Sequence, residues 1–487
     1  MNVGGHVVIP HTKAKYVISD VLLISSGTWL EVDPNTTIYE ADGNNVSLLR
    51  NANLAVTPLD HDIRVTGGIW DNNWDGNPGI DRFATGQFFL KSSKASPVRG
   101  ASGTLGFYGV TRLILEDITV VNPNHFGIQV AVCHDWSACR IRFTRDRPTV
   151  SDGIHVNGPS SRFTIRDVSG ATEDDFIALN PWDWSDSCPD ETAGDITDGT
   201  IEVLRPAPCA WAIVKMNTGT NAGVYNVSIR DVKGTSINGP FEWGHMTPDQ
   251  LNPAHVSGSG AIGGITLRDV AVASEANPTT FGIQFGAALT IVCDAQDIVI
   301  DGVVIDAAHQ LFNMPWVTVE PGHSVRSLSV THMRATDPKL SCLFAFAGTV
   351  DRFALTDSDF QTTGNDAGAQ QQPLIRLAGG SAVKLIQISD VRLHRYAGLL
   401  EQVPGAGSTQ VLVANSQFDA IENVFQIGGT ADLALAGAHF SNVGTAIVNC
   451  AHPASQVLVR SAGCFLSSPA LVKSAGTARW IGGDLPL

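Results

Sequence analysis

One short pattern recurs along the chain and constrains the fold more than any other feature of the sequence. The pattern is apolar, any, apolar, any, often Asp or Asn, then apolar, as in LILEDI at Leu113–Ile118. Its copies start at Leu113, Phe163, Val227, Ile265, Ile298, Leu328, Phe353, Ile386, Val411, Leu433 and Val457. From Val227 onward, neighbouring starts lie between 22 (433 − 411) and 38 (265 − 227) residues apart. A repeated unit of this size is typical of a solenoid.

Each copy has the pattern of one short β-strand with a single buried face. Apolar and polar residues alternate, and no 3.6-residue helical period links the copies. Gly, Asn, Asp and Ser lie between the copies, as expected for turns. The pattern therefore predicts an all-β parallel β-helix, whose coils stack at the inter-strand distance of about 4.8 Å. A β-propeller would need four antiparallel strands in about 40 residues, and these repeats are too short and irregular for it.

We predict one continuous solenoid domain over residues 1–487. Three longer excursions interrupt the regular coils, and insertions of this kind usually carry function on one face of a solenoid. These are Trp70–Gly106, Pro181–Pro208 and Gly239–Gly260. We therefore expect residues 1–310 to form the functional coils. The plainer coils of residues 311–487 are expected to be structural or an assembly surface, which leaves a homo-oligomer open.

Composition argues against several kinds of partner. The formal net charge of −16 argues against nucleic acid, and no apolar run reaches the about 18 residues of a membrane span. The amino-terminal residues lack the features of a signal peptide, so the compartment stays open, with an extracellular or periplasmic one favoured if a signal peptide was removed. None of the eight cysteines shows the paired spacing of a zinc site. Disulfides are left open for three close pairs: Cys133 with Cys139, Cys188 with Cys209, and Cys450 with Cys464.

Three aspartates are the strongest candidates for chemistry. Asp152 and Asp174 lie 22 residues apart (174 − 152), about one coil, so their carboxylates can share one face of neighbouring rungs, and Asp175 adds a third. Crowded carboxylates cannot all ionise easily, so at least one should keep a proton near neutral pH. Glycoside hydrolysis uses such an acid together with a carboxylate base, without a metal or other cofactor. Because adjacent strand residues point to opposite sides, the chain must bend at Asp174 and Asp175 for both to face one cleft.

The motifs around these aspartates resemble those of a known family. SDGIHV at Ser151–Val156, followed one coil later by TEDDFIAL at Thr172–Leu179, resembles the NTDG and GDDC motifs of glycoside hydrolase family 28, the polygalacturonases and rhamnogalacturonases. Residues Ala212–Val232 are similar to the stretch after that family's RIK motif, and the opening GGHVVIP is similar to its first coils. The likeness covers roughly residues 1–310. It implies the right-handed parallel β-helix of the pectin-lyase-like superfamily.

The resemblance implies an inverting glycoside hydrolase that cleaves a poly- or oligosaccharide. It implies Asp174 as the general acid, with Asp152 and Asp175 as the bases that hold the attacking water. Lys215 matches the lysine of RIK, which helps to bind substrate, but the arginine of that motif falls at Ile213 and the family's histidine motif is missing. Since a guanidinium suits a uronate carboxylate, we expect a glycan other than plain galacturonan.

Further residues near the insertions are candidates for substrate contacts. Histidine and glutamate can bind sugar hydroxyls or carry protons, and a tryptophan ring can stack on a sugar face. Each of these residue types is also common as a structural side chain. With Lys215, the predicted contacts are His155, Trp182, Trp184, Glu242, Trp243 and His245.

Two other classes of function fit the same fold. A uronate lyase or epimerase could use Lys215 as a base, although the candidate residues are rich in carboxylates and poor in arginine. A glycosyl-transferring enzyme is a further alternative on the same fold. A non-catalytic glycan-binding or tailspike-like protein would use the coils as a rigid shaft. Unsaturated products would favour the lyase, and glycan binding without turnover would favour the shaft.

Overall fold

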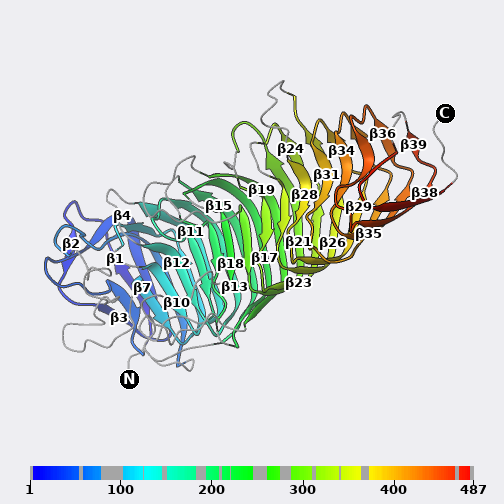
Figure 1. The fold of residues 1–487 in the computed structure, drawn as a ribbon. Coiled ribbons are helices and arrows are strands. Elements are labelled where there is room, and N and C mark those ends of the chain that lie inside the picture. Colours follow the sequence, from blue (N-terminus) through cyan, green and yellow to red (C-terminus); the bar gives the residue numbers. More distant parts are fainter. Residues whose placement is uncertain are drawn as a thin grey trace. The chain divides into compact units, whose positions relative to one another are not determined.

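The computed structural model describes most of the chain. The described residues are 4–53, 59–77, 103–123, 126–144, 151–181, 194–207, 211–219, 221–237, 239–244, 260–274, 287–309, 314–338, 342–363, 372–466 and 471–482. Within them the chain forms strands and turns and no helix, so none of these segments is a helix that could cross a membrane. The registered pairings between named strands are all parallel, as in β10–β12 and β26–β29. The predicted all-β, right-handed parallel β-helix is confirmed (Figure 1).

The chain divides into two compact units, Met1–Ile262 and Gly263–Leu487. The three aspartates lie in the first unit. One continuous domain that changes character near residue 310 stays a prediction.

The first unit contains two parallel sheets. One sheet contains β1 (His6–Ile9), β2 (Tyr16–Ile18), β4 (Trp29–Glu40), β6 (Asp60–Asp71), β8 (Val110–Glu116), β9 (Thr119–Val121), β11 (His134–Thr144), β13 (Ser160–Gly170), β15 (Ile196–Pro206) and β17 (Val224–Ser236). The second contains β3 (Leu22–Ile24), β5 (Leu49–Asn51), β7 (Gly103–Tyr108), β10 (Phe126–Ala131), β12 (Asp152–Asn157), β14 (Ile177–Asn180), β16 (Val214–Met216) and β18 (Phe241–Gly244). Successive coils contribute neighbouring strands to this second sheet, which carries the aspartates.

The second unit repeats the same construction with shorter strands. Its first long strands are β19 (Ala261–Ser274) and β21 (Asp294–Ile305). They are followed by β23 (Ser324–Thr331), β26 (Thr349–Thr356), β29 (Ala382–Ser389), β32 (Thr409–Ala414), β35 (Thr430–Ala436), β38 (Gln456–Ala462) and β41 (Thr477–Gly482). A short strand follows each of six of these coils: β24 (Arg334–Thr336), β27 (Asp359–Gln361), β30 (Arg392–His394), β33 (Gln417–Asp419), β36 (His439–Ser441) and β39 (Phe465–Leu466). The remaining sheet contains β20 (Leu289–Val292), β22 (Val317–Val319), β25 (Phe344–Phe346), β28 (Pro373–Leu377), β31 (Gly398–Gln402), β34 (Asn423–Ile427), β37 (Ala446–Cys450) and β40 (Val472–Ser474).

The Asp or Asn of the repeated pattern turns the chain at a corner in most of the predicted copies. Ten of the eleven predicted copies have a residue with a φ between 47° and 75° four positions after their start. These residues are Asp117, Asp167, Asp231, Asp269, Gly302, His332, Asp357, Asp390, Asn415 and Gly437. Asp, Asn and Gly tolerate this left-handed region better than other residues, which explains the composition of the position. In the last copy Val459, not Val457, pairs with Leu433, and Gly463 has the positive φ.

The described cysteines form no disulfides. Cys133, Cys139 and Cys450 are free thiols, so neither the Cys133–Cys139 pair nor the Cys450–Cys464 pair is bonded. Cys188 and Cys209 lie outside the described residues.

The left-handed corner gives a stability prediction at Asp390, which is exposed and has a φ of 56°. Asp390→Val should lower the free energy of unfolding by about 1–2 kcal/mol, because a β-branched side chain clashes in this region. Asp390→Asn should stay close to the parent, because Asn tolerates the same φ. Urea denaturation compares the two variants, and equal losses would contradict the role of the corner.

Candidate active site

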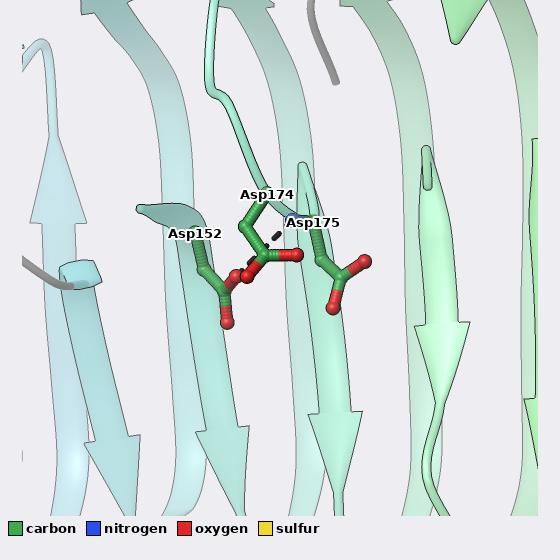
Figure 2. Close-up of side chains that lie close together, drawn as sticks. All are labelled: Asp152, Asp174 and Asp175. Atoms are coloured by element: carbon green, nitrogen blue, oxygen red, sulfur yellow. Dashed lines mark hydrogen bonds between the residues drawn. The ribbon is translucent and has the colours of Figure 1, made fainter. Parts of the chain in front are cut away.

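The three aspartates of the sequence motifs meet on two neighbouring rungs. Asp152 begins β12, and Asp174 and Asp175 lie in the irregular segment that precedes β14. Figure 2 shows the three carboxylates side by side, and one oxygen of each lies within 4.8 Å of the others. The bend that the sequence requires at Asp174 and Asp175 is present, and it frees both residues from the alternation of a strand.

Hydrogen bonds and a glycine hold the two rungs together. The N–H of Asp175 donates to Asp152 Oδ1 at 3.1 Å, and the N–H of Gly153 donates to the carbonyl of Asp175 at 2.8 Å. A Cβ on Gly153 would lie 2.4 Å from the carbonyl oxygen of Phe176. The glycine that follows Asp152 in the motif is therefore needed for this close approach.

The three carboxylates differ in how deeply they are buried. Asp152 and Asp175 are 4% and 3% exposed, whereas Asp174 is more exposed than either. Burial raises the pKa of Asp175 well above its usual value, the charges of Asp174, Asp152 and Glu242 add to this effect, and Lys215 opposes it. Asp175 Oδ1 has no hydrogen-bond partner within the described part of the chain. An oxygen in this state can accept a hydrogen bond from water or from a sugar hydroxyl.

Lys215 and Glu242 extend the site along the next two rungs. The strand register aligns Ala178, Lys215 and Glu242 on the outward side of β14, β16 and β18. Lys215 Nζ lies 3.4 Å from Asp175 Oδ2 and 3.7 Å from Glu242 Oε2. Burial disfavours the charge of Lys215, but the neighbouring carboxylates outweigh it and raise the pKa of the ammonium. Burial also raises the pKa of Glu242.

The three carboxylates are close enough to share a cation, because one oxygen of each lies within 4.8 Å of the others. Carboxylate oxygens are the usual ligands of hard divalent ions. Lys215 already places a positive charge beside Asp175.

His155 contacts the first aspartate directly. Its Nδ1 lies 2.6 Å from Asp152 Oδ2, and its ring stacks on Phe126 with a centroid distance of 3.7 Å. The residue is 2% exposed. His155 therefore supports Asp152 from beside it on the same strand.

The remaining predicted contacts are placed differently. Trp243 is 0% exposed and follows the outward Glu242, so strand alternation puts its ring inside the coil, where it packs in the core and does not line a surface. Trp182, Trp184 and His245 lie outside the described residues. The structure thus joins His155, Lys215 and Glu242 to the aspartates.

Sequence reasoning missed three buried polar residues on the same outward face. Tyr108, Gln129 and Asn157 connect to His155 through hydrogen bonds. Gln129 lies 26 residues before His155 (155 − 129), about one coil, and pairs with it in register. The one-coil spacing that identified the aspartates could also have identified Gln129.

Comparisons with known proteins show similarity of fold. No protein-family model and no curated protein sequence matches the chain. The family 28 exopolygalacturonase of Yersinia enterocolitica is 13% identical, with a TM-score of 0.45 over 79% of this chain and 73% of that chain. The tailspike protein of E. coli bacteriophage HK620, solved with a hexasaccharide, is 12% identical, with a TM-score of 0.46 over 96% of this chain and 74% of that chain. The pre-mature gene product 12 of bacteriophage phi29 is 12% identical, with a TM-score of 0.49 over 93% of this chain and 65% of that chain.

At these identities the likeness concerns the fold alone. The parallel β-helix itself rests on the strand pairing of this chain. Family 28 glycoside hydrolases and phage tailspikes are among the solved structures that this chain is similar to.

Proposed function

We propose that this protein is a glycoside hydrolase that cleaves a poly- or oligosaccharide with Asp152, Asp174 and Asp175. The observation that carries the proposal is the cluster of three carboxylates within 4.8 Å, in which the pKa of Asp175 is raised by burial. Hydrolysis needs a proton donor for the leaving oxygen and a proton acceptor for the attacking water. Neighbouring carboxyls in unequal environments can supply both. The resemblance to family 28 implies the same chemistry, with inversion.

The proposed roles follow the exposure of each carboxyl. Asp174 is the most exposed of the three, so it is the acid that reaches the glycosidic oxygen. Asp152 and Asp175 hold the water, and Asp175 Oδ1 has no hydrogen-bond partner among the described residues. The negative charge of Asp174 helps to raise the pKa of Asp175, so the protonation of these two neighbouring carboxyls is linked.

The surroundings of Lys215 disfavour a lyase or epimerase. Lys215 could take a proton from carbon only as a neutral amine. Asp175 and Glu242 flank Lys215 at 3.4 and 3.7 Å and raise its pKa, which keeps the side chain protonated and unable to accept a proton. Hydrolysis uses Lys215 instead as a positive charge beside the carboxylates.

The charges of the site favour a neutral glycan. Among the described residues, the four carboxyl groups of Asp152, Asp174, Asp175 and Glu242 lie around the ammonium of Lys215. The segments that follow β14 and β18 along the chain, residues 182–193 and 245–259, contain no Lys or Arg. Within the described part of the chain, the ammonium of Lys215 beside these carboxyls already pairs with Asp175 and Glu242, so a uronate carboxylate would meet repulsion here.

The first test removes the proposed acid. Asp174→Asn should lower kcat by about 10²- to 10⁴-fold, because an amide cannot deliver a proton. The fold should be unchanged, because the side chain is not fully buried. Asp357→Asn, an exposed aspartate at a corner of the second unit, is the matched control and should leave kcat unchanged.

Retained turnover in Asp174→Asn would refute the assignment of the acid. Glycan binding by the parent protein without any turnover would favour a non-catalytic glycan-binding or tailspike-like protein.

The second test compares neutral and uronate-containing oligosaccharides of equal length. Neutral substrates should give a kcat/KM at least about 10-fold higher, since one unfavourable charge contact in a buried site costs on the order of 1 kcal/mol or more. Reducing-sugar release measures both. Preferred cleavage of galacturonan would contradict the neutral-substrate proposal and leave the roles of the aspartates standing.

The third test uses the pH dependence of the reaction. Asp175 must lose its proton to hold water as a base. The rising limb of the plot of kcat/KM against pH should therefore have an apparent pKa above the usual aspartate range. Lys215 lowers the pKa of Asp175, and its removal in Lys215→Gln should therefore move this limb to higher pH.

Lys233→Gln is the control for the pH profile, because Lys233 pairs with Asp231 on the other sheet and its side chain is 57% exposed. Its limb should coincide with that of the parent. A limb that moves to lower pH in Lys215→Gln would contradict the assigned coupling.

A further inference from the structure

One chain of hydrogen bonds crosses three neighbouring rungs and ends on Asp152. Tyr108 Oη donates to Gln129 Oε1 at 2.6 Å, and Gln129 Nε2 donates to Asn157 Oδ1 at 2.9 Å. Asn157 Nδ2 lies 3.2 Å from His155 Nε2, and His155 Nδ1 lies 2.6 Å from Asp152 Oδ2. The links join β7, β10 and β12 on their outward side.

The hydrogen bonds of this chain all donate in one direction, from Tyr108 toward Asp152. An amide nitrogen can only donate, so His155 Nε2 must accept from Asn157, and the ring proton of a neutral imidazole must sit on Nδ1. That proton then points to Asp152. A proton on Nε2 would require the amides of both Asn157 and Gln129 to turn over together.

Tyr108, the first residue of this hydrogen-bond chain, is held in place through its backbone. Asn51 Oδ1 accepts from the N–H of Tyr108 at 2.8 Å, and Asn51 Nδ2 donates to its carbonyl at 2.7 Å. A Cβ on Gly106 would lie 2.9 Å from Tyr108 Cε2 and 3.0 Å from Oη. Gly106 pairs in register with Gln129, so the missing side chain lets the tyrosine ring lie across its own strand toward Gln129.

Burial restricts this hydrogen-bond chain to one arrangement. Tyr108, Gln129, Asn157, His155 and Asp152 are between 0% and 4% exposed. Buried polar networks whose members are satisfied hold one arrangement, because any alternative leaves a donor or acceptor unpaired.

We propose that Tyr108, Gln129, Asn157 and His155 are positioning residues of the proposed hydrolase. They fix the tautomer and the orientation of His155, and His155 in turn fixes the carboxylate of Asp152. Asp152 is then held between two donors, His155 Nδ1–H and the N–H of Asp175. Its remaining lone pairs are left for the attacking water, and this part of the proposal rests on the proposed hydrolase function.

Two substitutions of His155 separate its two hydrogen bonds. In His155→Asn the amide nitrogen can replace Nδ1 and still donate to Asp152. In His155→Gln the longer side chain reaches the position of Nε2 and loses that donor. We expect His155→Gln to lower kcat by about 10- to 100-fold with little change in KM, and His155→Asn to recover most of the loss.

A role in packing alone would give the opposite order, because Gln is closer to His in size. Equal losses in the two variants, or a loss that falls on KM, would overturn the positioning role.

A distal variant tests the far end of the chain. Tyr108→Phe removes one oxygen and keeps the ring, so it should fold normally and lower kcat by a smaller factor, without a change in KM. Tyr39→Phe is the matched control, because Tyr39 Oη also donates to an asparagine, Asn73, away from the aspartates. An unchanged kcat in Tyr108→Phe would exclude Tyr108 from the positioning residues.

The tautomer of His155 can be measured without any substrate. Long-range ¹H–¹⁵N correlation spectra of the folded protein, assigned by the peak lost in His155→Asn, should show a neutral ring protonated on Nδ1 at pH 7. A proton on Nε2, or an imidazolium, would overturn the proposal. If His155 is protonated on Nδ1 but the protein cleaves no glycan, the inferred hydrogen-bond chain would stand and the proposed hydrolase function would be rejected.

Discussion

Parallel pairing of each coil with the next is the interaction on which the rest of this structure depends. It fixes which side chains stack along the sheet, so that Gln129, His155, Ala178, Lys215 and Glu242 occupy one outward column. A shift of one residue on any rung would turn these side chains inward. The site is therefore built from residues far apart in sequence that share one position in the coil.

The fold was predictable because its signal is local and repeated. The left-handed corner favours Asp, Asn or Gly, and the adjoining strand needs alternating apolar residues, so most coils show both features in a few residues, as in Leu113–Ile118. The spacing of one coil also placed the aspartates on neighbouring rungs, where the register sets Asp152 beside Asp175. The strand that starts at Val457 shows the limit: two valines at alternate positions fit the pattern equally well, and only the pairing of Val459 with Leu433 decides the register.

The rest of the site depends on side-chain direction, which short strands do not reveal. β18 contains only four residues, all buried, so its sequence does not tell whether Glu242 or Trp243 faces outward. The partner of Lys215 was equally hidden, because Asp175 leaves the strand alternation at a bend. The hydrogen bonds of Gln129 and Asn157 depend on the same choice of side. The strand register in the structure shows which side chains face outward, and the sequence pattern does not.

The electrostatics of this outward column argue for a function beyond stability. In the second unit, the corresponding column of β28 and β31 pairs Arg376 with Glu401 at 3.2 Å, one charge against one, with both side chains partly in water. In the first unit two buried carboxylates share the ammonium of Lys215. Burying a carboxylate with incomplete compensation costs free energy and raises its pKa, as for Asp175. Since the same fold builds the balanced arrangement elsewhere, the unbalanced charges among the described residues support the proposed proton transfer at this site.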